Sequence, residues 1–251
     1  MKNEDLKDRV ALVTGASRNI GRAIAVALAL RGADVIVHVA TDRSSGAETV
    51  AAVEAEGRTA LLVSGDLSEP ETAARIVAEG VERFGRLDIV VNNAAIRPEA
   101  AFADITFADW RKVMGVALDA VFLVSQAALP HLLKSDQASI VNLGGLTGHT
   151  GAAHRAHVIT AKAGVVGLTK ALAHELSPEG ITVNCVAPGL IETKRMANEG
   201  AAPKHHDSRK TLVGRRGRPD EVAEAVAYLV GPAARYVTGE TLHVNGGVYL
   251  S

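Results

Sequence analysis

Short apolar runs rich in β-branched residues alternate along this chain with longer segments that have helical periodicity. The short runs are nearly continuous in apolar residues, which is typical of strands buried on both faces of a parallel sheet. They predict strands at 9–14, 34–40, 59–66, 87–94, 138–145, 181–189 and 241–247. Helices are predicted at 20–30, 47–56, 70–84, 107–133, 161–176 and 219–229. This order predicts an α/β fold with helices on both faces of a parallel sheet.

The chain shows no linker, repeat or low-complexity segment, so residues 1–251 are predicted to form a single domain. Ser68 is predicted to cap the helix that carries Pro70 in its first turn. The one irregular stretch, 191–218, is rich in charge and weakly periodic. Long irregular segments in such folds are commonly binding loops, so a lid is predicted there.

The composition of the chain favours a soluble globular protein over a nucleic-acid-binding, membrane or disulfide-bonded one. Of the 251 residues, 47% are hydrophobic, which is ample for a core, and the formal net charge is −1. A near-neutral chain argues against nucleic acid or an anionic membrane as its main partner. The single cysteine, Cys185, excludes an intrachain disulfide. No apolar run is expected to reach the ~18 residues of a membrane span, and the charged N-terminus does not resemble a signal peptide, so we expect a soluble, cytoplasmic protein.

The segment TGASRNIG, residues 14–21, joins the first predicted strand to the first predicted helix. Glycines there permit a tight turn and a close approach of the backbone to a pyrophosphate, which the free N–H groups of the helix N-terminus can bind. The alternative is an ordinary strand–helix turn. Its position at the start of an alternating chain favours a dinucleotide site.

Four motifs together resemble the short-chain dehydrogenase/reductase family. TGASRNIG is similar to its TGxxxGxG fingerprint, and NNAA (92–95) to its NNAG motif. VAPGLIET (186–193) is similar to its PGxxxT motif, and VNGG (244–247) to its C-terminal signature. The resemblance covers nearly the whole chain. It implies a single Rossmann-type NAD(P)-binding domain, with a doubly wound parallel sheet of about seven strands, and a homo-oligomer, commonly a tetramer.

The same resemblance implies which residues contact the nicotinamide cofactor. They are Gly15, Ser17, Arg18, Asn19, Ile20, Gly21, Asp66, Leu67, Asn93, Ala94, Lys162, Pro188, Gly189 and Thr193. Asn19 stands where the middle glycine of the fingerprint is usual. Asparagine tolerates a positive φ better than most residues, so the turn is expected to survive the change.

NADP(H) is predicted in preference to NAD(H). An NAD-preferring member carries an acidic residue at the tip of the second strand, where this chain has Val39. Arg18 lies in the glycine-rich turn and Arg43 follows nearby, and a guanidinium suits a 2′-phosphate because it can donate two parallel hydrogen bonds. The alternative is that both arginines are solvated surface residues.

The family transfers a hydride with the help of an asparagine, a serine, a tyrosine and a lysine. At the matching positions this chain has Ala117, Gly145, Val158 and Lys162, so only the lysine remains. The three tyrosines of the chain all lie beyond Lys162. The resemblance therefore implies an atypical catalytic site.

Two hypotheses follow. In the first, the protein is an oxidoreductase with a histidine as proton donor, taken from His149, His154 and His157. If the helix already begins at residue 154, then His154, Val158 and Lys162 share one face. The histidines could instead line a pocket rim, serve the structure, or hold a metal together. In the second hypothesis, the protein binds NADP(H) as a sensor or partner subunit without ordinary carbonyl chemistry.

Eight basic residues lie between Lys194 and Arg218. They are Lys194, Arg195, Lys204, Arg209, Lys210, Arg215, Arg216 and Arg218. Such a run is either a solvated face or a sign of an anionic small-molecule substrate, for example an acyl thioester.

Overall fold

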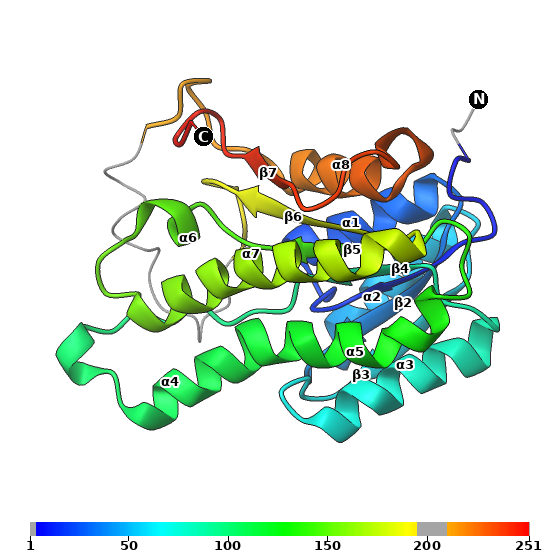
Figure 1. The fold of residues 1–251 in the computed structure, drawn as a ribbon, viewed down its shortest axis with the longest axis horizontal. Helices are drawn as coiled ribbons and strands as arrows, with labels where there is room; N and C mark the ends of the chain where they lie inside the picture. Colours follow the sequence, from blue (N-terminus) through cyan, green and yellow to red (C-terminus); the bar gives the residue numbers. More distant parts are fainter. Residues whose placement is uncertain (1–3, 195–209, 251) are drawn as a thin grey trace.

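A seven-stranded parallel sheet forms the centre of the molecule, with the strand order β3-β2-β1-β4-β5-β6-β7 (Figure 1). The computed structural model describes residues 4–194 and 210–250. Its strands are β1 (Val10–Val13), β2 (Asp34–Val39), β3 (Ala60–Ser64), β4 (Ile89–Asn92), β5 (Ser139–Leu143), β6 (Thr182–Pro188) and β7 (Thr241–Val244). The predicted α/β fold and all seven predicted strands are confirmed.

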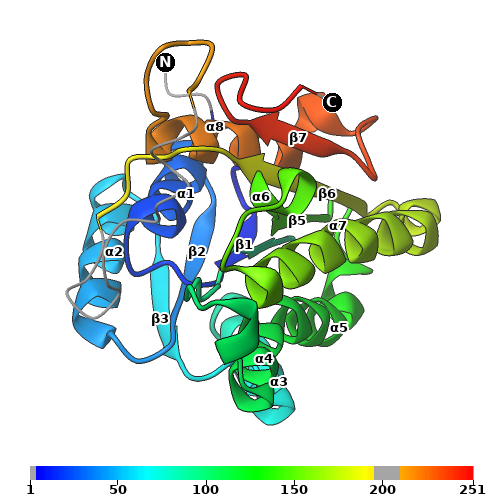
Figure 2. The same ribbon diagram turned by 90° about the vertical axis from the view of Figure 1, so that its left-hand side faces the viewer.

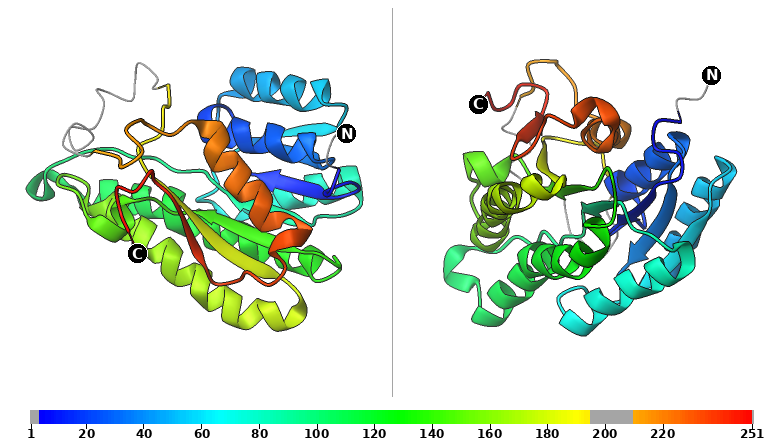
Figure 3. Two further views of the ribbon diagram at one scale, coloured as in Figure 1. Left: turned by 90° about the horizontal axis from the view of Figure 1, so that it is seen from above. Right: turned by 45° about the vertical axis from the view of Figure 1, so that its right-hand side comes forward.

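Two layers of helices cover opposite faces of this sheet (Figure 1, Figure 3). The helices of eight residues or more are α1 (Asn19–Leu30), α2 (Arg43–Ala55), α3 (Pro70–Phe84), α4 (Phe107–Met114), α5 (Ala120–Leu132), α7 (Ala156–Leu176) and α8 (Pro219–Val230). The short α6 spans Thr147–Thr150. Successive strand residues point to opposite faces. Ala11 and Val13 accordingly pack with α1 and α8, whereas Val10 and Leu12 pack with α3 and α5.

The starts of two helices and the N-cap of a third differ from the predictions. α2 begins at Arg43 rather than 47, because the Asp42 side chain accepts a hydrogen bond from the Ser45 N–H and caps a polar first turn. α7 begins at Ala156 rather than 161. Ser68 does not cap α3: the N-cap is Glu69, without a side-chain bond, and Ser68 donates to Asp66 instead. Periodicity predicts helix interiors better than it predicts their polar first turns.

A single continuous helical stretch, Phe107–Leu132, joins α4 to α5 through a π-helical turn at Gly115–Asp119. It is 26 residues long and contains an 18-residue window with a mean hydropathy of 1.7, so it is long and apolar enough to cross a membrane, contrary to the expectation for this chain. Val124, Ala128 and Leu132 are nevertheless fully buried against the α3 side of the sheet. The stretch is therefore a core helix.

Candidate functional site

The glycine-rich turn lies at the carboxyl edge of the sheet, which Figure 2 shows from the front. Gly15 has φ +62°, and a Cβ built on it would lie 2.8 Å from the Ala94 Cα. A Cβ on Gly21 would lie 2.6 Å from the Asn93 Nδ2. Only glycine therefore permits this packing of the turn against the chain after β4.

The N-terminus of α1 points out of this turn with no side-chain cap and no acidic residue in its first turn. Its first N–H groups have no partner within the helix itself. Together with the helix dipole they make a site suited to an anion such as a pyrophosphate. The turn that the motif predicts is thus present with the geometry that a dinucleotide requires.

The carbonyl groups of the turn are held by side chains on its far side. The Thr49 Oγ1 donates to the Ala16 carbonyl at 2.8 Å, and the Arg22 guanidinium donates to the Ser17 carbonyl at 2.6 Å. Both supporting residues were missed from the sequence, because they lie in helices without a local motif. Their bonds keep the turn in one conformation.

Asn93 supports the same turn from beneath. Its Nδ2 donates to the carbonyls of Thr14 and Gly15 at 2.9 and 3.0 Å. The Thr14 hydroxyl in return accepts from the N–H groups of Asn93 and Ala94. The motif after β4 therefore positions the glycine-rich turn, and the Asn93 side chain is engaged there.

Asn19 has φ +49°, so the expectation that asparagine can replace glycine here is confirmed. Its side chain also has partners that a glycine would lack. The Nδ2 donates to the Lys194 carbonyl and the Oδ1 accepts from the Lys194 N–H, both at 2.9 Å. Asn19 thus ties the start of α1 to the beginning of the predicted lid.

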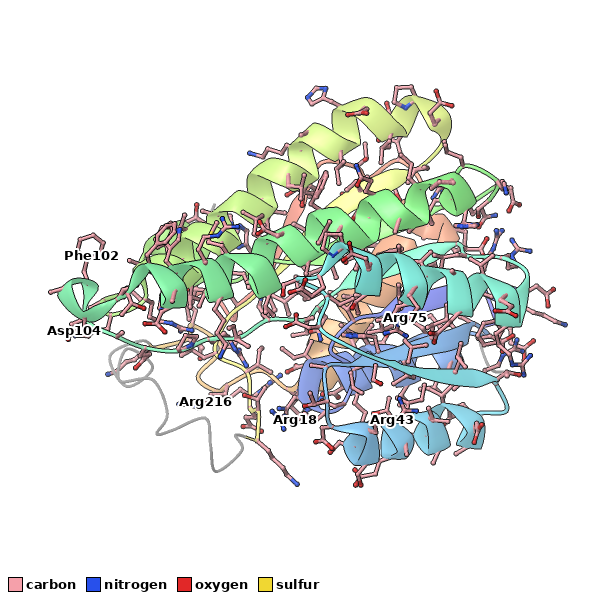
Figure 4. The ribbon with its side chains drawn as sticks, turned by 90° about the horizontal axis from the view of Figure 1, so that it is seen from below. Arg18, Arg43, Arg75, Phe102, Asp104 and Arg216 are labelled. Carbon is pink, nitrogen blue, oxygen red and sulfur yellow. The ribbon has the colours of Figure 1, made fainter. Side chains whose placement is uncertain are left out.

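The adjoining strand tip carries no acid. Val39 is buried, Arg18 is half-buried, and Arg43 is exposed and donates to the Ser64 hydroxyl at 2.6 Å. Figure 4 shows Arg18 and Arg43 on the side of the molecule that carries α2. On the neighbouring loop, exposed Asp66 accepts bonds from Ser68, and Leu67 is buried. This edge of the site therefore carries positive charge from Arg18 and Arg43 and negative charge from Asp66 and from Asp42, whose carboxylate interacts with Arg18.

Lys162 lies in α7 with its side chain buried, and its Nζ donates to the Leu143 carbonyl at 2.5 Å. Burial, assisted by the charge of Arg97, lowers the pKa of Lys162 from 10.5 to about 8. Arg97 was missed from the sequence, since it follows the NNAA motif without a signal of its own. Val158, one turn before the lysine, is buried as well.

Gly145 follows two residues after Leu143, whose carbonyl Lys162 contacts, and it borders open space, because a Cβ built on it meets no atom within 4 Å. Ala117 is fully buried in the π-helical turn. Pro188 ends β6, and Gly189 packs so closely on Asn245 that a Cβ would lie 2.6 Å from its Cα. Thr193 is half-buried. These segments converge at the carboxyl edge of the sheet.

The predicted alignment of His154 with Val158 and Lys162 is wrong. His154 precedes α7, has φ +63°, and is exposed, with its carbonyl accepting from the Ala100 N–H. A left-handed backbone cannot continue a right-handed helix, so the shared face does not extend to this residue.

His157 is in α7 and almost fully buried, and burial lowers its pKa. It is turned ~100° from Val158 on the helix. The carboxylate of Asp109 in α4 partly opposes the effect of burial on the pKa of His157. His149 instead packs on His243 and Tyr249, with ring centroids 4.6 and 5.6 Å away. Within the described ranges no three His, Cys, Asp or Glu side chains come together as metal ligands. The arrangement does not support a metal shared by the three histidines.

Of the eight basic residues counted near the lid, Arg195, Lys204 and Arg209 lie outside the described residues. Arg215 forms an ion pair with Glu221 at 2.5 Å, and Arg218 with Asp220 at 3.1 Å. These acids belong to the first turn of α8. Part of the positive charge is therefore balanced locally.

Known proteins resemble the chain over nearly its whole length. A family model described as enoyl-(acyl carrier protein) reductase matches residues 15–249. The 3-oxoacyl-[acyl-carrier-protein] reductase FabG of Vibrio cholerae is 40% identical over 246 residues, covering 98% of this chain and 99% of that protein. The FabG of Escherichia coli is 37% identical over 247 residues, with 98% and 99% covered.

Solved structures with the same fold also resemble this chain over nearly its whole length. A short chain dehydrogenase from Burkholderia cenocepacia in complex with NADP has a TM-score of 0.91 and 37% identity, covering 97% of this chain and 99% of that one. A dehydrogenase/reductase from Sinorhizobium meliloti has a TM-score of 0.92 and 35% identity, covering 99% and 98%. With this sheet, this glycine-rich turn and this degree of identity, the chain belongs to the short-chain dehydrogenase/reductase family of NAD(P)-dependent oxidoreductases.

Proposed function

We propose that this protein is a cytoplasmic reductase that uses NADPH to reduce a carbonyl group, of the 3-oxoacyl-thioester type or a related C=N or C=C substrate. The observation that carries the proposal is the uncapped N-terminus of α1 at the glycine-rich turn, which contains Arg18 and lies beside the uncharged Val39 at the end of β2. The relatives named as 3-oxoacyl-[acyl-carrier-protein] reductases support the substrate class. By family resemblance, we propose one NAD(P)-binding domain per chain, a lid at 191–218 and a homotetramer.

The turn suits a dinucleotide because Gly15 and Gly21 let it pack closely on Ala94 and Asn93, which supports the uncapped N-terminus of α1 as a site for the pyrophosphate. In this proposal Ser17, Asn19, Ile20 and the rest of the turn bind the pyrophosphate. Arg18 binds the 2′-phosphate, and Asp66 binds the adenine amine. Lys162 binds the nicotinamide ribose. The rest of the dinucleotide is contacted by Leu67, Ala94, Pro188, Gly189 and Thr193.

When bound, NADPH supplies a hydride to the substrate carbon. The chain must then provide a proton for the substrate oxygen. We propose that the site is atypical, because Ala117, Gly145 and Val158 bring no polar side chain to the positions of the family's asparagine, serine and tyrosine. His157 is the stronger candidate donor, since it shares α7 with Lys162. Exposed His154 remains the other candidate.

Positive charge near the reacting position favours an anionic substrate. Arg97 acts on Lys162 strongly enough to contribute to its lowered pKa. Two cationic side chains in one partly desolvated site attract a carboxylate, or stabilise the oxyanion that develops during hydride transfer. The competing function is a cofactor-binding sensor or partner subunit, which would bind NADPH at the same turn without turnover.

NADPH is expected to bind more tightly than NADH. Replacing Arg18 by alanine should weaken NADPH binding about tenfold or more, because a charge-assisted hydrogen bond to the 2′-phosphate is lost. NADH affinity should stay unchanged. Calorimetric titration of both cofactors measures this, with Arg58→Ala as control, since Arg58 pairs with Asp34 at the opposite edge of the sheet. Equal losses for both cofactors would remove Arg18 from the 2′-phosphate site.

Turnover of simple ketones is expected to be low, because a missing general acid costs about 10²–10⁴ in rate. The double change Gly145→Ser with Val158→Tyr should raise kcat about tenfold or more, and the space beside Gly145 accommodates the serine. Gly145→Ser with Val158→Phe is the matched control, since it adds the ring without the hydroxyl. A tyrosine variant no faster than the phenylalanine variant would contradict the atypical site.

The histidine hypothesis predicts that kcat/KM depends on a group that titrates below about pH 6.5, since burial lowers the pKa of His157 from that value. His157→Ala should cost about 10²-fold in rate with nearly unchanged NADPH affinity. Lys162→Ala should lower both the rate and the affinity for NADPH. His174→Ala, an exposed histidine later in α7, is the control. If His154→Ala and His157→Ala both keep the full rate and pH profile, neither histidine is the donor.

A further inference from the structure

His38 is buried between two loops of the candidate cofactor site, one after β1 and one after β3. Its Nδ1 accepts a hydrogen bond from the Gly15 N–H at 3.2 Å, and its Nε2 lies 3.0 Å from the Gly65 carbonyl oxygen. A carbonyl can only accept, so Nε2 must carry the ring proton. Both bonds therefore require a neutral ring in one tautomer.

The strand order explains why this residue reaches both loops. β2 lies between β3 and β1 in the sheet. Its end also holds both loops through the backbone, because the Ala16 N–H donates to the His38 carbonyl at 2.8 Å and the Gly65 N–H to the Val39 carbonyl at 3.1 Å. The ring completes this connection between the pyrophosphate turn and the loop that carries Asp66.

Charged neighbours act on the ring with opposite signs. Burial lowers the pKa of His38, the carbonyl of Gly65 and the carboxylate of Asp66 oppose that effect, and Arg75 of α3 adds to it. Burial prevails, so the ring is neutral at pH 7. A second proton would have to sit on Nδ1, directly against the Gly15 N–H, and would replace a hydrogen bond by a repulsion.

We propose that His38 is a pH-sensitive positioning residue for the cofactor: the neutral ring fixes the glycine-rich turn relative to the Asp66 loop, and protonation releases the turn and weakens binding. This inference rests on the proposed function, in which a dinucleotide binds at this edge. Since folding lowers the pKa of His38, its contribution to stability is full above about pH 6.5 and is lost as the pH falls through the folded-state value.

The test is calorimetric titration of NADPH from about pH 8 to about pH 5.5, on the wild-type protein and on His38→Asn. The asparagine oxygen can accept from the Gly15 N–H but does not titrate in this range. The phosphates of NADPH titrate equally in both experiments, so the ratio of the two Kd values isolates the histidine. We expect the wild-type Kd to rise several-fold, up to about tenfold, relative to the variant.

A ratio that stays constant with pH, while NADPH binds tightly, would refute the role of His38 and leave the proposed function intact. Absence of NADPH binding to the wild-type protein at every pH would refute the proposed function itself. If His38→Asn does not fold, His38→Gln replaces it, because its longer side chain can still donate to the Gly65 carbonyl. Melting curves at about pH 8 establish which variant is folded.

Discussion

The close approach between the glycine-rich turn and the chain after β4 is the constraint on which the rest of the site depends. A single added Cβ at Gly15 would lie 2.8 Å from the Ala94 Cα, so the two backbones can meet only if that residue is glycine. Once they meet, Asn93 and Thr14 hold them together through side-chain hydrogen bonds. The direction of α1, and with it the anion site at its N-terminus, follows from this contact.

The part of the site proposed to bind the cofactor retains most of the family's motif residues, whereas the part proposed to carry out hydride transfer retains few of them. Where the cofactor is proposed to bind, the glycine-rich turn and the NNAA motif are joined by hydrogen bonds, and the departure within the glycine-rich fingerprint, Asn19, forms two bonds to Lys194. Where hydride transfer is proposed, Lys162 is buried, Val158 is buried one turn before it in α7, and Gly145 borders open space. Under the proposed function, this difference means that nucleotide binding is retained and that proton transfer depends on another group.

Much of the fold and part of the candidate site could be predicted from the sequence, for identifiable physical reasons. The five inner strands are almost wholly buried, so their apolar runs are nearly continuous, and the half-buried edge strands β3 and β7 are apolar enough to be predicted with them. The first turn of α2 is polar, and the first turn of α7 contains His157, so periodicity placed both helix starts too late. The left-handed backbone of His154 lies outside any recognised motif, so, unlike that of Asn19, it was not predicted. The partners of Asn19 and His38 are distant in the chain, and no local pattern indicates them.

The central claim is that a dinucleotide binds at the glycine-rich turn with its reactive end beside Lys162. A crystal structure of the NADPH complex tests this most directly. We expect the pyrophosphate at the N-terminus of α1, the 2′-phosphate within hydrogen-bond distance of Arg18, and a ribose hydroxyl within hydrogen-bond distance of the Lys162 Nζ. A complex with the pyrophosphate elsewhere, or with the nicotinamide directed away from Lys162 and Val158, would contradict it.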